Sequence, residues 1–164
     1  MDTITKIIGD YHTFLDTVFT NLEDTQIDVS DFYIDHIAYR TLTEEDYILR
    51  KDQLSPYGEM ISEKIIRDRP VAIFKLNTPL SYNHSTIPYF ELLAPADGDA
   101  YQEGLEHAEF VVDIPLSQIA RKYPSILSVL KDRKINAELV LKFPNNANVK
   151  FHELPIDEVI EIEK

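Results

Sequence analysis

The sequence predicts an α+β fold in which two related modules build one curved mixed sheet, with an N-terminal helical arm packed on it. Three observations support this fold class. An early segment has the apolar spacing of an amphipathic helix, runs of β-branched and aromatic residues alternate with helical segments, and the order of these elements partly repeats. We expect a helix over residues 1–30 and a domain over 31–164, with modules over about 31–96 and 104–164.

The first module is predicted as one strand, one helix and three strands. The arm before it has apolar residues every three or four positions. They are Ile4, Ile7, Ile8, Tyr11, Leu15, Val18, Phe19 and Leu22. A strand is expected over residues 33–40, and Thr43 with the acids that follow it predicts a helix that reaches about Leu54. The three later strands are expected at residues 59–66, 71–76 and 86–93.

The second module is expected to repeat this order with one strand fewer. Residues 105–112 predict its leading strand, and a helical segment interrupted at Pro124 is expected over 115–134. Two strands are expected at residues 136–143 and 149–154, before a closing helical turn at 155–160.

The composition is acidic and contains no cysteine. The chain has 16 Lys and Arg residues against 29 Asp and Glu residues, which gives a formal net charge of −13. Such a surface repels phosphate groups, so we expect neither nucleic acid nor an anionic membrane as a partner. The lack of cysteine excludes disulfides, thiolate metal sites and cysteine nucleophiles. No signal peptide or membrane span is evident, so we expect a soluble cytoplasmic protein.

The two leading strands carry the same pattern around a histidine. In each, an acid precedes the histidine and an aromatic residue follows three positions after it, so His36 aligns with His107. Glu91 near the end of the first module aligns in the same way with Glu153. Because side chains alternate between the faces of a strand, the histidines point away from the apolar face that packs on the helices. If both modules curl toward a common interior, these four side chains converge there.

Two imidazoles with one or two carboxylates suit a divalent first-row metal such as Zn, Fe, Ni or Mn better than they suit Mg or Ca. The predicted ligands are His36, Glu91, His107 and Glu153. His152 competes with Glu153, because adjacent residues of a strand face opposite ways and only one can point inward. Parity with Val149 and Phe151, together with the match to Glu91, favours Glu153.

Four segments of the chain, at residues 34–40, 69–72, 90–92 and 106–111, resemble the YecM-like proteins. Those proteins belong to the vicinal oxygen chelate superfamily, with glyoxalase I, extradiol dioxygenases and bleomycin-resistance proteins. The resemblance implies paired βαβββ modules that form a curved sheet around a metal site. The implied ligands come from the first and last strands of each module and fall on His36, Glu91, His107 and Glu153. Relatives with this architecture often pair, so a homodimer is one expected assembly.

Further side chains are candidates for roles beside the metal. Glu109 shares the histidine face of its strand and is a candidate general base, substitute ligand or partner that orients an imidazole. Glu153 is a second candidate to move a proton. Arg40 and Lys75 are candidates to bind an anionic substrate. Two acids are expected to point away from the metal and to be structural, Asp35 and Glu106.

A metal with these ligands keeps open coordination positions, so a substrate can chelate it through neighbouring oxygens while the ion acts as a Lewis acid. The expected function is metal-dependent isomerase, lyase or dioxygenase chemistry on a small oxygen-chelating molecule. One alternative is a non-catalytic module that sequesters a small molecule or metal. Another is a structural protein whose histidines only form hydrogen bonds. The sequence contains no nucleophile elbow and no glycine-rich phosphate loop.

Overall fold

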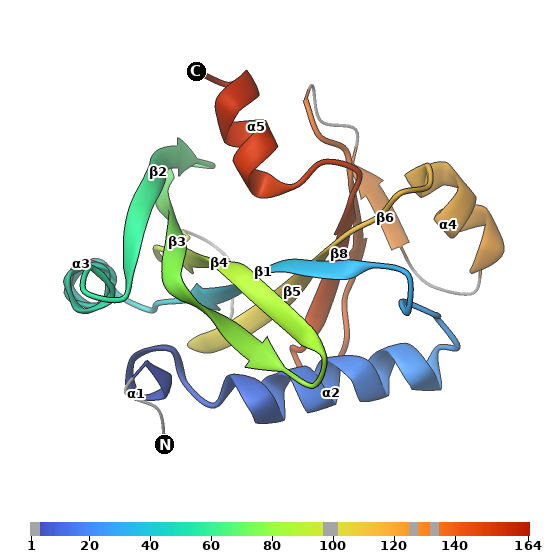
Figure 1. Ribbon diagram of the computed structural model, residues 1–164, viewed down its shortest axis with the longest axis horizontal. Helices are drawn as coiled ribbons and strands as arrows, with labels where there is room; N and C mark the ends of the chain where they lie inside the picture. The colour runs from blue at the N-terminus through green and yellow to red at the C-terminus, as the bar shows by residue number, and fades with distance from the viewer. Residues whose placement is uncertain (1–3, 97–101, 125–127, 132–134) are drawn as a thin grey trace.

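The computed structural model describes residues 4–96, 102–124, 128–131 and 135–164, and Figure 1 shows their arrangement. The helices are α1 (Thr5–Ile8), α2 (Tyr11–Asp24), α3 (Glu44–Leu54), α4 (Leu116–Lys122) and α5 (Ile156–Ile162). The strands are β1 (Tyr33–Arg40), β2 (Gly58–Ile66), β3 (Arg69–Tyr82), β4 (Ser85–Leu93), β5 (Gly104–Val111), β6 (Ser128–Lys131), β7 (Glu138–Leu141) and β8 (Asn148–His152).

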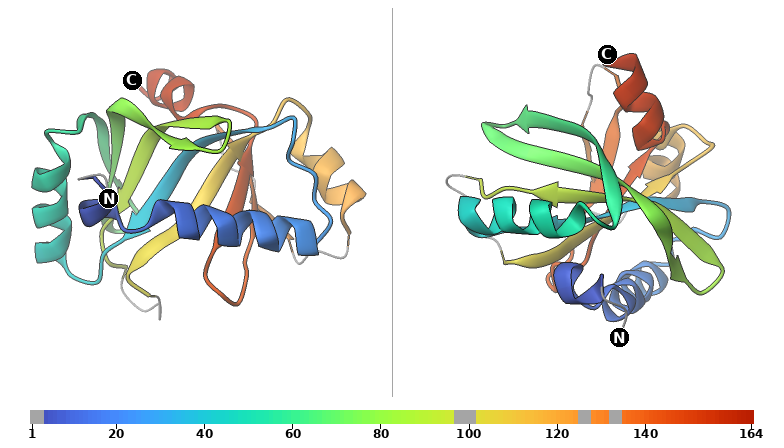
Figure 2. Two further views of the ribbon diagram at one scale, coloured as in Figure 1. Left: turned by 60° about the horizontal axis from the view of Figure 1, so that its bottom comes forward. Right: turned by 60° about the vertical axis from the view of Figure 1, so that its left-hand side comes forward.

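The described strands form one eight-stranded sheet in the order β2-β3-β4-β1-β5-β8-β7-β6. β1 and β5 lie antiparallel at its middle. Each has a parallel neighbour from its own module, β4 beside β1 and β8 beside β5. The modules are therefore β1-α3-β2-β3-β4 and β5-α4-β6-β7-β8, which together form the curved sheet seen in Figure 2. The predicted α+β fold class with two related modules is confirmed.

The second module contains four strands, one more than its sequence pattern predicts. The helix expected over residues 115–134 ends at Lys122. The same range contains β6, which pairs antiparallel with β7. The expectation that this module lacks a strand was therefore wrong. Pro124 cannot continue a helix, and β6 is only four residues long. A short apolar pair such as Val129-Leu130 does not distinguish a strand from a helical segment.

Two other boundaries differ from the expected ones. The N-terminal arm is two helices, because the chain bends at Gly9, which has φ +88°, and α2 then starts with Asp10 as its N-cap. The Asp10 side chain accepts a hydrogen bond from the Thr13 backbone N–H at 3.2 Å. β3 continues beyond the strand expected at 71–76 and reaches Tyr82 before the hairpin turn.

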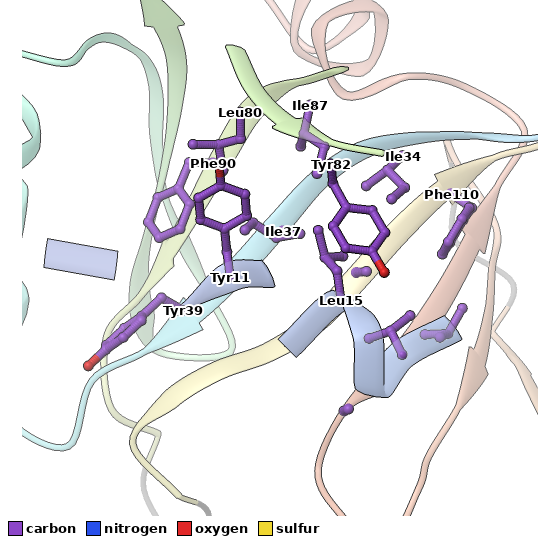
Figure 3. Packing of buried hydrophobic residues seen from close by; sticks show 14 of the residues in the cluster. Tyr11, Leu15, Ile34, Ile37, Tyr39, Leu80, Tyr82, Ile87, Phe90 and Phe110 are labelled. Carbon is purple, nitrogen blue, oxygen red and sulfur yellow. The ribbon is translucent and has the colours of Figure 1, made fainter. Parts of the chain in front are cut away.

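One face of the sheet packs against α2 and holds the main hydrophobic core (Figure 3). Leu15 and Val18 of α2 are fully buried, as are Ile37 of β1 and Ala108 of β5. Burying a leucine, valine or isoleucine side chain contributes about 1.5–3 kcal/mol to the stability of the fold. The prediction that the apolar faces of the two leading strands pack on helices is confirmed.

The opposite face carries the histidines and is partly covered by α5, which lies across it in Figure 1. A second hydrophobic cluster joins this helix to the first module. Its buried members are Ala38, Val71, Ile73, Tyr89, Leu93 and Ile160. The sheet is therefore sandwiched between α2 on one side and α5 on the other. Among the described residues, no helix combines the length and the apolar character that crossing a bilayer requires.

Candidate metal centre

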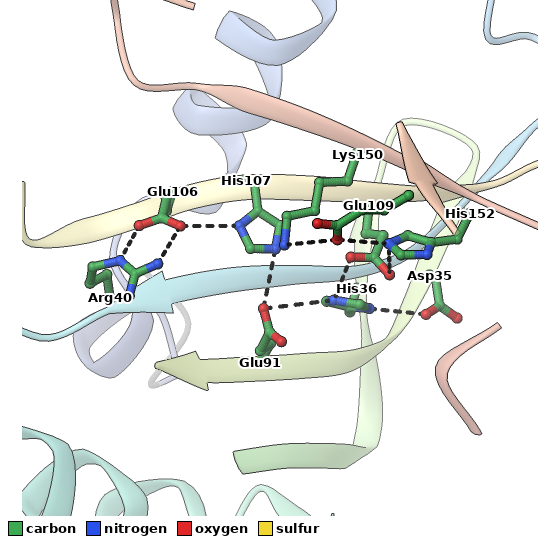
Figure 4. Close-up of polar contacts among 10 residues, drawn as sticks. Asp35, His36, Arg40, Glu91, Glu106, His107, Glu109, Lys150 and His152 are labelled. Atoms are coloured by element: carbon green, nitrogen blue, oxygen red, sulfur yellow. Dashed lines mark hydrogen bonds and ion pairs between the residues drawn. The ribbon is translucent and has the colours of Figure 1, made fainter. Parts of the chain in front are cut away.

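Three of the predicted ligands come together on the α5 side of the sheet. They are His36 on β1, Glu91 on β4 and His107 on β5 (Figure 4). Glu91 Oε2 lies 3.1 Å from His107 Nε2 and 4.0 Å from His36 Nε2. The sheet order explains the meeting, because β4, β1 and β5 are adjacent and all three residues occupy the same face.

An acid holds the far side of each imidazole. Asp35 Oδ2 lies 2.9 Å from His36 Nδ1, and Glu106 Oε1 lies 3.4 Å from His107 Nδ1. A neutral imidazole that donates from Nδ1 presents the lone pair of Nε2, which in both rings faces Glu91. Both acids contact the rings on the side away from Glu91, and Asp35 also forms a second group of possible metal ligands with His36 and Glu109. The expectation that both acids point away from the centre was therefore wrong for Asp35. The acid before each histidine in the repeat was the available signal for these contacts.

The atoms that face one another at this centre are buried, and in the described part of the chain they make no hydrogen bond. They are His36 Nε2, His107 Nε2 and Glu91 Oε2. Glu91 Oε2 is within ion-pair distance of both rings but forms no hydrogen bond with either, and a buried polar atom without a hydrogen bond costs about 1–3 kcal/mol. Two imidazole nitrogens and a carboxylate oxygen are ligands that a divalent first-row metal accepts. The residues therefore fit the metal that the family resemblance implied.

The electrostatics of the centre also favour a cation. Burial acts to lower the pKa of His36, but the charges of Glu109 and Asp35 outweigh it and raise that pKa well above its usual value. Burial acts to raise the pKa of Glu91, yet the contact with His107 lowers it to about 2. A site that stabilises protonated histidine and ionised carboxylate carries excess negative charge, which a divalent metal would neutralise.

Glu109 lies between two histidines. Its Oε2 is 3.3 Å from His36 Nε2, and its Oε1 is 3.2 Å from His152 Nε2. His152 Nε2 also lies 3.7 Å from Glu138 Oε2. Despite its burial, Glu109 has a pKa well below the usual value because both histidines face it. It can therefore contact a molecule bound at the centre, while His152 and Glu138 extend the polar cluster along β8 and β7.

The structure places Glu153 outside this cluster, so the predicted inward orientation of Glu153 was wrong. Its side chain is exposed, and Oε1 accepts a hydrogen bond from the Leu116 backbone N–H at 2.9 Å, at the start of α4. Val149 and Phe151 pack in the core beneath α2. Glu153 alternates in step with these two residues and so belongs to the face covered by α2. His152 faces the other way, toward the centre.

The two predicted anion-binding residues are not beside the three donors. Arg40 is buried and donates hydrogen bonds from Nε and Nη2 to the Glu106 carboxylate, the second at 2.6 Å. It thus supports the acid that contacts His107. Lys75 is exposed on β3 and lines a cleft of about 610 Å³ between the first module and α5. Lys75 pairs with Tyr89, which pairs with His36, so it lies two strands, or about 10 Å, from that histidine.

Comparisons with known proteins agree with the fold. A family model described as "YecM protein" matches residues 3–143. Protein YecM of Escherichia coli (strain K12) is 26% identical over 112 residues, which cover 68% of this chain and 60% of that protein. This chain spans about three fifths of the length of the curated relatives it matches.

Two solved structures share the architecture. "Structural Genomics, Protein EC4020" has 23% sequence identity and a TM-score of 0.80, and the match covers 93% of this chain and 88% of the other. The hypothetical protein BH1468 from Bacillus halodurans C-125 has 13% identity and a TM-score of 0.51, with 74% and 93% covered. With the strand order described above, they support the paired-module fold that the resemblance implied.

Proposed function

Because this chain belongs to the YecM family, and because three buried donors converge in its described part without hydrogen bonds, we propose that it binds one divalent first-row metal. The proposed ligands are His36, Glu91 and His107. The observation that carries the proposal is that two imidazole nitrogens and one carboxylate oxygen face one another, buried and without hydrogen bonds among the described residues. Asp35 would keep His36 in the tautomer that binds metal through Nε2. Glu106 Oε1 lies 3.4 Å from His107 Nδ1, on the side of that ring away from Glu91.

We further propose that the centre acts on a small oxygen-chelating molecule in an isomerase, lyase or dioxygenase reaction. When bound, the metal would supply Lewis-acid polarisation of an oxygen and open positions for two neighbouring oxygens of a ligand. Glu109 Oε2, 3.3 Å from His36 Nε2, is placed to accept a proton from such a ligand. Burial of the surrounding side chains would exclude water and strengthen these interactions.

A second candidate function is sequestration of a metal or small molecule without turnover. The burial of the donors favours it: the side chains of His36 and His107 are 1% and 2% exposed, and α5 packs on the same face. The two functions differ in the effect of Glu109→Gln. An enzyme would lose turnover and keep its metal, whereas a sequestering protein would keep its ligand affinity.

The test of the metal proposal is elemental analysis of protein purified without added metal, for the wild type and for His107→Ala. We expect close to one metal per chain in the wild type and a loss of most of it in the variant. His84→Ala is the matched control, because His84 is exposed in the turn between β3 and β4. Circular dichroism would establish that each variant is folded. Equal metal content in wild type and His107→Ala would overturn the proposed ligand set.

A further inference from the structure

We propose that Lys150, which stands in the second module where the metal ligand Glu91 stands in the first, binds the anionic end of a small molecule. That molecule chelates the metal through its other oxygen atoms. The ligand class is a small carboxylate with a neighbouring oxygen, such as a 2-oxo or 2-hydroxy acid. This inference rests on the proposed function and specifies the substrate class of the same site.

The position of Lys150 follows from the register of the two modules. His36 pairs with Glu109 and Ala38 pairs with His107, so an approximate two-fold axis passes between β1 and β5 and exchanges the two histidines. In the first module Glu91 lies beside Ala38, two residues beyond the histidine. In the second module Lys150 lies beside Glu109, again two residues beyond the histidine. Lys150 is therefore the counterpart of Glu91, with a positive charge in place of a negative one.

The side chain of Lys150 lies on the centre's side of the sheet. It shares a face of β8 with His152 (Figure 4), and its Nζ lies 4.0 Å from Glu138 Oε2. Its charge also contributes to the lowered pKa of Glu91. The Lys150 side chain is 22% exposed, whereas that of His107 is 2% exposed. Lys150 is therefore more accessible to solvent than the donors are, so an entering ligand can contact it.

The Lys150 ammonium is the reason why this ligand would be an anion. Glu91 and Glu109 offset the charge of a divalent metal held by two neutral imidazoles. Lys150 Nζ lies 4.0 Å from Glu138 Oε2, beyond hydrogen-bond distance, so its N–H donors can bind a further carboxylate. Arg40 differs, because Glu106 accepts two of its hydrogen bonds. A carboxylate that chelates the metal with a neighbouring oxygen would also receive a charge-assisted hydrogen bond from Nζ. A neutral chelator would leave the ammonium without this contact.

The experiment compares wild type with Lys150→Met, Lys150→Glu and the control Lys6→Met, since Lys6 is exposed on α1. Isothermal titration calorimetry first measures the binding of Mn²⁺ or Zn²⁺ to each chelator-treated protein. It then measures the binding of oxalate, a dianion with vicinal oxygens, and of neutral lactamide to the metal-loaded proteins.

We expect Lys150→Met to weaken oxalate binding at least tenfold without weakening metal binding or changing lactamide binding. Lys150→Glu should tighten metal binding at least tenfold, because it supplies a fourth ligand, the second carboxylate of the set. Unchanged oxalate binding in Lys150→Met would overturn the inference and leave the metal proposal intact. If wild type binds no metal, the proposed function fails. If Lys150→Glu binds metal and wild type does not, residue 150 is supported as the counterpart of Glu91 at the centre. If neither wild type nor Lys150→Glu binds metal, both proposals are overturned.

Discussion

Asp35 connects the candidate metal centre to α5, and Asp35→Ala tests both connections. The side chain of Asp35 is 1% exposed. Its Oδ2 lies 2.9 Å from His36 Nδ1 and accepts a hydrogen bond from the Ile156 backbone N–H at 3.1 Å. A hydrogen bond to a charged group contributes about 1.5–3 kcal/mol and a typical one about 1 kcal/mol. We therefore expect Asp35→Ala to lower the free energy of unfolding by about 2–4 kcal/mol.

Urea unfolding in the presence of a chelator measures this loss without any contribution from bound metal. Asp31→Ala is the matched control, because Asp31 is exposed just before β1. A separate metal titration should show affinity reduced about 10–100-fold in Asp35→Ala, as expected for removal of a carboxylate that orients a ligating histidine. If both Asp35→Ala and Asp31→Ala unfold at the same urea concentration as wild type, the reasoning about Asp35 is refuted.

Three further predictions follow from the same contacts. The pKa of Glu91 is lowered to about 2 from 4.5, so its stabilisation of the metal-free protein is fully present above about pH 4.5 and is lost as the pH falls toward 2. Acid unfolding of Glu91→Gln should show a shallower pH dependence, and an identical profile would contradict this. Phe110→Ala should cost about 3–5 kcal/mol in urea unfolding, because Phe110 is buried against Phe19 and Phe151; a loss below 1 kcal/mol would count against the packing described. Glu153→Gln should leave metal content at the wild-type level, and loss of metal would restore Glu153 as a ligand.

The sequence repeat made the three proposed metal ligands predictable. His36 and His107 occupy the same place in related strands, and strand alternation put both on the face away from α2. Glu91 followed from the same argument because β4 lies directly beside β1. Local pattern and duplication were therefore sufficient to identify three side chains that meet from distant parts of the chain.

The remaining residues around the centre could not be predicted from the sequence pattern. The choice between His152 and Glu153 required knowing which face of β8 packs beneath α2, and Phe151 resolved it only in the folded chain. The role of Lys150 required the register between β5 and β8. The contact between Asp35 and His36, which are neighbours in sequence, depends on side-chain rotamers that strand alternation alone does not specify.

The antiparallel pairing of β1 with β5 divides the candidate centre between two halves of the molecule. His36 and Glu91 come from one half and His107 from the other. A fragment carrying the first half alone would have an open strand edge along β1 and two of the three donors. Two full-length chains could instead exchange halves across this seam, each donating β5 to the other. Such a domain-swapped pair would retain two complete centres, each built from both polypeptides.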